Sequence, residues 1–132
     1  MQNFSENITE ILLLAFLAIT FLQSSSDKVL DWKGNLQWLT SHFAKSPFKN
    51  LVPMLLAVLL LTESAAGILC SLGVFEKLLG FSAGLSFMGA VLACIALLML
   101  LLGQRLAKDY DGARTIAIYF VPAVFLVFLL QQ

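Results

Sequence analysis

The chain has 132 residues, of which 60% are hydrophobic and 12% are charged, and its mean hydropathy is +0.92. Soluble domains are about 45–50% apolar and about 25% charged, so this composition predicts an integral membrane protein. The eight basic and eight acidic residues balance, so the chain has no net positive charge that would attract nucleic acid. The sequence also contains no nucleic-acid-binding motif.

Four apolar stretches are long enough to cross a bilayer, which takes about 20 residues of helix. They lie at about 8–26, 51–73, 78–102 and 115–130. The first follows an acidic tail and precedes no small-residue cleavage site, so we expect a retained helix and not a signal peptide. Pro122 is compatible with the fourth, because neighbouring helices can satisfy the carbonyl that it leaves without a donor. The sequence predicts an all-α, four-helix membrane bundle forming one domain, residues 1–132.

The first polar loop, residues 27–50, contains a further helical pattern. In "DWKGNLQWLTSHF" the apolar side chains recur at helical spacing. We expect an interfacial helix at about 35–45, with Trp32 and Trp38 as anchors at the level of the lipid headgroups. The alternative is an irregular loop whose aromatic side chains cover the end of the bundle.

Only Val74–Lys77 separates the second and third stretches, which predicts a tight antiparallel hairpin. In that hairpin Gly67 faces Gly84, and Gly80 and Gly84 form a pair of small residues four apart. Such pairs allow membrane helices to approach closely. The alternative is that these glycines are merely tolerated.

The basic residues suggest an orientation, because cytoplasmic loops are rich in Lys and Arg. Loops 27–50 and 103–114 together contain Lys28, Lys33, Lys45, Lys49, Arg105, Lys108 and Arg114. The opposite side has only Lys77. We therefore expect both loops in the cytoplasm, and the N- and C-termini in the periplasm of a bacterial inner membrane.

Glu63 interrupts the second apolar stretch, and an acid inside the membrane is costly enough to suggest a functional site. It should face the bundle interior with a partner. Lys28 can extend inward from the end of the first helix, Gln23 is a neutral candidate, and Arg105 competes for the same role. Three interpretations remain open: a structural polar contact, a site for a ligand, quinone or proton, and a contact to another subunit.

Other chemistry has little support in the sequence. Cys70 and Cys94 are expected at different depths, too far apart for a disulfide, and no CxxC motif is present. His42 is the only histidine, which excludes bis-histidine haem ligation within one chain. We predict no catalytic residue set, no metal site and no cofactor held by this chain alone.

Two segments resemble the DoxX family of small four-helix membrane proteins. These are "FLQSSSDKVLDW", with Lys28 after a small-residue run, and "ESAAGILCSLG", in which Glu63 is followed by Gly67 and Gly73. The resemblance implies a four-helix bundle, and it selects Lys28 and Glu63 as the residues that match the family's motifs. It also implies membrane complexes as partners, because relatives include the small subunit of thiosulfate:quinone oxidoreductase and the membrane protein MauE.

The first functional interpretation is therefore an accessory or structural subunit of a larger inner-membrane complex, without its own redox centre. The alternative is a quinone-linked subunit of a respiratory oxidoreductase, in which Glu63 and Lys28 border a pocket. A small transporter or an assembly factor is the third, and homo-oligomers and membrane lipid are further candidate partners.

Overall fold

A computed structural model of the chain describes residues 6–44, 49–82 and 84–132. These ranges form helices and no strand, namely α2 (Ile8–Leu30), α3 (Trp32–His42), the 3-10 helix η1 (Lys49–Leu51), α4 (Val52–Leu79), α5 (Gly84–Leu106) and α6 (Tyr110–Leu130). Four of them, α2, α4, α5 and α6, are long and apolar enough to cross a membrane. The predicted all-α membrane bundle is confirmed, and Pro122 lies within the continuous helix α6.

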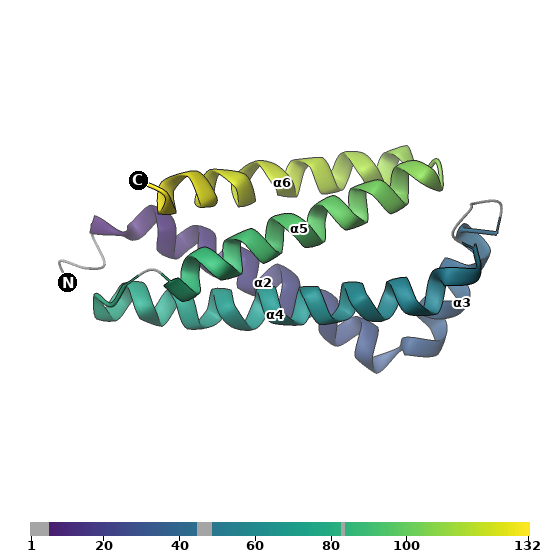
Figure 1. Cartoon of the computed structure of the whole chain (residues 1–132), viewed down its shortest axis with the longest axis horizontal. Helices are drawn as coiled ribbons and strands as arrows, with labels where there is room; N and C mark the ends of the chain where they lie inside the picture. The colour runs from purple at the N-terminus through teal and green to yellow at the C-terminus, as the bar shows by residue number, and fades with distance from the viewer. Residues whose placement is uncertain (1–5, 45–48, 83) are drawn as a thin grey trace.

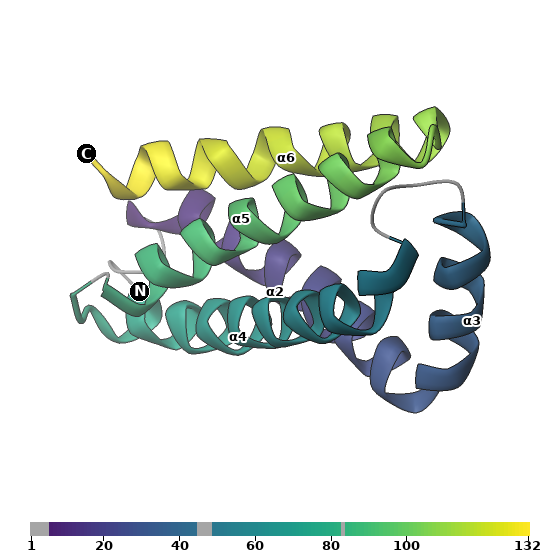
Figure 2. The same ribbon diagram turned by 45° about the vertical axis from the view of Figure 1, so that its right-hand side comes forward.

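The four long helices run side by side, with the start of α2 and the end of α6 at the same end of the bundle (Figure 1). The largest contacts join α2 to α4, α4 to α5, and α5 to α6, whereas α6 makes few contacts with α2. Helix α3 lies across the opposite end of the bundle (Figure 2). It contacts α2 and α4. The expected helix in the first loop therefore exists, although it begins at Trp32 and ends at His42; Lys45, at the end of the predicted segment, lies outside the described residues.

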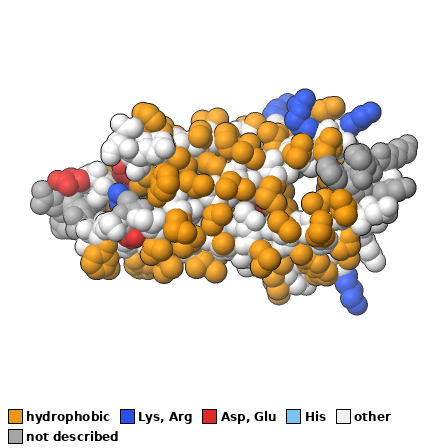
Figure 3. All heavy atoms as spheres, viewed as in Figure 1, with side chains coloured by type: hydrophobic (Ala, Val, Ile, Leu, Met, Phe, Trp, Pro, Cys, Tyr) orange, Lys and Arg blue, Asp and Glu red, His pale blue; other side chains and the backbone are white. Residues whose placement is uncertain are grey.

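Charge is unevenly distributed between the two ends. Hydrophobic side chains cover the middle of the bundle, and Lys and Arg side chains gather toward the end that carries α3 (Figure 3). The elements explain this pattern, because the loops that join α2 to α4 and α5 to α6 both lie at that end. Lys77, in the last turn of α4, lies at the other end.

The hairpin between α4 and α5 differs from the sequence prediction. Helix α4 does not stop at Gly73 but continues to Leu79, and Gly80 ends it in a left-handed conformation with φ of 79°. Glycine adopts this conformation without steric cost, which makes it a common helix C-cap. The connection therefore begins at Gly80 and not at Val74, and the predicted contacts across the hairpin shift.

Because of this shift, the predicted pairing of Gly67 with Gly84 is wrong. A Cβ built at Gly84 has no neighbour within 4 Å, and Gly80 is the C-cap of α4. Gly67 packs against Leu22 of α2. The close approach of α4 and α5 occurs elsewhere: a Cβ built at Gly89 would lie 2.8 Å from the backbone nitrogen of Cys70.

Helix α5 faces the core with a row of small residues. They recur at intervals of three or four and are buried: Ser86, Gly89, Ala90, Ala93 and Ala96. Small side chains allow two helix backbones to approach closely, which strengthens the van der Waals contact between them. This contact matters in lipid because the hydrophobic effect does not drive helices together there. Larger side chains of the neighbouring helices, such as Leu14, Leu17 and Phe21, complete the core.

Candidate functional site

Glu63 is buried in the bundle, as an acid inside a membrane helix should be. Its side chain is 1% exposed, and it lies about 17 Å along the axis from the start of α4. The ammonium of Lys28 reaches it from the last turn of α2, with Nζ 2.9 Å from Oε1. The structure thus brings together the two residues that the DoxX resemblance selects.

The helix around Lys28 positions its ammonium. Ser24 lies one turn earlier, and its Oγ accepts a hydrogen bond of 2.8 Å from Nζ. The attraction between this ammonium and the Glu63 carboxylate is electrostatic. An ammonium has three N–H donors, so the contacts with Ser24 and Glu63 leave at least one for another acceptor.

The other predicted partners of Glu63 lie elsewhere. Gln23 is exposed. Arg105 is exposed as well, and its guanidinium carbon lies 5.5 Å from the centre of the Tyr110 ring. This cation–π contact joins Arg105, in the last turn of α5, to Tyr110 at the start of α6. Among the described residues, Lys28 is the cation that pairs with Glu63.

The register of α2 and α4 explains why a lysine near a helix end meets an acid near a helix centre. Leu22 faces Gly67, and Lys28 faces Glu63. The two helices are antiparallel, so α2 ends at Leu30 while the first two turns of α4 continue past it. Helix α3 crosses this end of the bundle and contacts α4 there.

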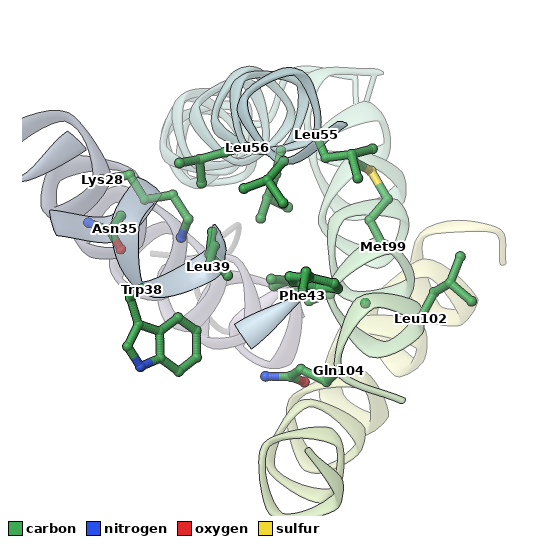
Figure 4. Close-up of a pocket in the computed structure, with 14 residues that line it drawn as sticks. Lys28, Asn35, Trp38, Leu39, Phe43, Leu55, Leu56, Met99, Leu102 and Gln104 are labelled. Atoms are coloured by element: carbon green, nitrogen blue, oxygen red, sulfur yellow. The ribbon is translucent and has the colours of Figure 1, made fainter. Parts of the chain in front are cut away.

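A pocket of about 310 Å³ lies where α3 covers these first turns of α4. Its lining is mostly apolar and comes from α2, α3, α4 and α5 and from Phe43, just after α3: Lys28, Asn35, Trp38, Leu39, Phe43, Val52, Leu55, Leu56, Leu59, Met99, Leu100, Leu102, Gly103 and Gln104. Lys28 points its amine toward the middle of this pocket (Figure 4). The same side chain therefore contacts the buried acid and borders the pocket.

Gly103 allows an aromatic wall on the α5 side of the pocket. A Cβ built there would lie 3.3 Å from Cζ of Phe43, so the ring packs closely against the α5 backbone. Near it, the buried Oε1 of Gln104 accepts no hydrogen bond from the described residues. Trp38, predicted as a membrane anchor, is 58% exposed and lines the pocket. Its anchoring role and that of Trp32 stay predictions.

Glu76 is a second buried acid, and sequence reasoning placed it in a loop. Its carboxylate accepts hydrogen bonds from the backbone N–H groups of Leu85, at 3.2 Å, and Ser86, at 3.0 Å. The Ser86 hydroxyl lies 2.9 Å from the same carboxylate and 3.2 Å from the carbonyl oxygen of Gly73. A carboxylate at a helix N-terminus satisfies donors that the helix leaves unpaired. Glu76 therefore has a structural role, capping α5.

Sequence reasoning missed most of the pocket because its lining comes from separate elements. Asn35 and Gln104 are 69 positions apart in the chain, and neither belongs to a motif. One signal was available for Glu76: a lone acid a few residues before a new apolar helix can cap that helix.

Metal and disulfide chemistry are not indicated by the residues that the structure describes. They contain no group of three or more His, Cys, Asp or Glu side chains placed to hold a metal ion. Cys70 and Cys94 are both free thiols. The predicted difference in their depth depended on the wrong hairpin register, because Cys70 packs against Gly89, five residues before Cys94. Compared with protein-family models, curated proteins and solved structures, the chain has no match in any of the three.

Proposed function

We propose that this chain is a DoxX-like accessory or structural subunit of a larger complex in the bacterial inner membrane. The observation that supports a partner is the position of α6 at the edge of the bundle. Only 17% of its most apolar segment is buried, against 28–33% for the other three membrane helices. Helix α6 packs on α5 and makes few contacts with α2, so most of its apolar surface faces outward.

The outward face of α6 is well suited to a helix of another membrane protein. Ile118 and Val121 are each 66% exposed, and the rings of Phe125 and Phe128 stack with centroids 6.4 Å apart. Helices associate in membranes mainly through van der Waals packing. An apolar face of this kind offers that contact to a partner subunit.

Purification in a mild detergent tests this proposal. We expect the tagged chain to bring along a larger membrane protein, identified by mass spectrometry. Val121→Trp should abolish this co-purification, because a large ring on the outward face of α6 blocks close packing. Leu61→Trp, at a residue of α4 that is 71% exposed, is the matched control and should retain it. A wild-type chain that migrates alone and remains stable contradicts the proposal, as does an equal effect of the two variants.

We also propose that the α3 end of the bundle faces the cytoplasm and that both termini are periplasmic. The lysines and arginines at the α3 end support this orientation through the positive-inside rule. In a background in which Cys70 and Cys94 are serine, we expect a membrane-impermeant maleimide applied to spheroplasts to label Gln131→Cys but not Lys33→Cys. The reverse pattern contradicts the orientation.

A further inference from the structure

We infer that the pocket beneath α3 binds a neutral, lipid-soluble molecule whose head carries a carbonyl oxygen, and that Lys28 donates a hydrogen bond to that oxygen. This class includes quinones and esters. The inference concerns a small molecule and holds whether or not the chain is part of a complex.

The size and lining of the pocket indicate the body of the ligand. A volume of about 310 Å³ is at the lower end of small-molecule sites, which span about 300–1,000 Å³. Aromatic and aliphatic side chains dominate the walls, among them Trp38, Phe43, Leu55 and Met99. Such walls favour an apolar chain or ring, because burial of apolar surface is the main attraction that they offer.

Lys28 indicates the chemistry of the head. Its amine points toward the middle of the pocket (Figure 4). Nζ lies 2.8 Å from Oγ of Ser24 and 2.9 Å from Oε1 of Glu63. At least one of its three N–H donors is therefore left for an acceptor in the pocket. A carbonyl oxygen meets this requirement. A hydrocarbon without a polar head would leave the donor without a partner in an apolar space, which costs free energy.

The ion pair with Glu63 indicates the charge of the head. The ammonium of Lys28 is already balanced by a carboxylate that is 1% exposed. An anionic ligand would therefore add an uncompensated negative charge to a largely apolar site, and such burial is strongly unfavourable. Among the described residues that line the pocket, Lys28 is the one charged side chain, and its charge is already paired. The site therefore favours a neutral head over a carboxylate or a phosphate.

Quenching of Trp38 fluorescence tests the inference, since Trp38 lines the pocket and Trp32→Phe makes it the only tryptophan. The protein is reconstituted in nanodiscs and titrated with three medium-chain dibrominated probes that share one chain: a methyl ester, the free carboxylate and the alkane. We expect saturable quenching by the ester and at least tenfold weaker binding of the carboxylate and the alkane. Quenching that does not saturate with any probe shows only partition into lipid and overturns the inference.

Two further variants separate the pocket from its surroundings. Leu55→Phe adds volume inside the pocket, and Leu61→Phe makes the same change on the outer face of α4, where the side chain is 71% exposed. The ester should lose its saturable binding in the first variant and keep it in the second. Equal binding in both variants places the probe on the outer surface and overturns the inference.

A double variant tests the role of Lys28. Lys28→Met with Glu63→Leu removes both charges together, so neither is left buried alone. We expect ester binding to weaken about tenfold or more, as loss of a hydrogen bond from a charged donor implies, whereas alkane binding should not change and so reports an intact pocket. Unchanged ester binding, or a carboxylate that binds the wild type as tightly as the ester, contradicts the proposed head chemistry.

Discussion

Lys28→Met is expected to lower the free energy of unfolding by about 3–5 kcal/mol, the usual effect of removing one partner from a buried ion pair. The Glu63 side chain is 1% exposed, and among the described residues its cation is Lys28. Without that cation a carboxylate remains in the apolar bundle interior. The measurement is an unfolding titration in detergent micelles, followed by circular dichroism.

The double variant Lys28→Met with Glu63→Leu should recover most of this loss. Replacement of a whole buried pair by apolar residues of similar size is often neutral or stabilising. Lys33→Met is the matched control, because Lys33 lies exposed on α3; its effect should stay within about 0.5 kcal/mol. If Lys28→Met and Lys33→Met change stability equally, the ion pair does not hold α2 against α4.

Glu76→Ala should cost about 2–4 kcal/mol in the same unfolding titration. The substitution removes the acceptor for the backbone donors of Leu85 and Ser86. A buried donor without a partner costs about 1–3 kcal/mol, and the lost bonds involved a charged acceptor. Glu76→Gln keeps one side-chain oxygen and should cost roughly half as much.

Hydrogen exchange separates this local role from a general loss of stability. In Glu76→Ala the amides of Leu85 and Ser86 should exchange faster than those in the middle of α5, because the cap protects the first turn. Asp27→Ala removes an exposed acid from α2 and should change neither stability nor exchange at α5. Uniform acceleration along α5 argues against the cap.

Several elements follow from local sequence because their physical signals are local. About 20 apolar residues are enough to predict a membrane helix, and four such helices are present. The position of Glu63 also follows from sequence, since an acid in an apolar helix must turn away from lipid. The helix in the first loop was recognisable from the spacing of its apolar side chains, although its start was misplaced by about three residues.

The hairpin register was not predictable in the same way. Glu76 and Lys77 look like a polar turn when each residue is judged by its own polarity. In the structure α4 continues through both, because Glu76 obtains its hydrogen bonds from the next helix. The displaced turn then gave wrong partners for Gly67 and Gly84. A single non-local interaction thus changed every contact across α4 and α5.

Sequence alone was sufficient for the class of this protein, its four membrane helices and the need of Glu63 for a buried partner, because each depends on the polarity of neighbouring residues. The tertiary structure showed that Lys28, and not Gln23 or Arg105, pairs with Glu63, and it placed a pocket beside this pair. The choice depends on where α2 ends relative to α4 and on how α3 crosses that end. These are relations between helices, set by packing across the bundle, and no single stretch of the chain encodes them.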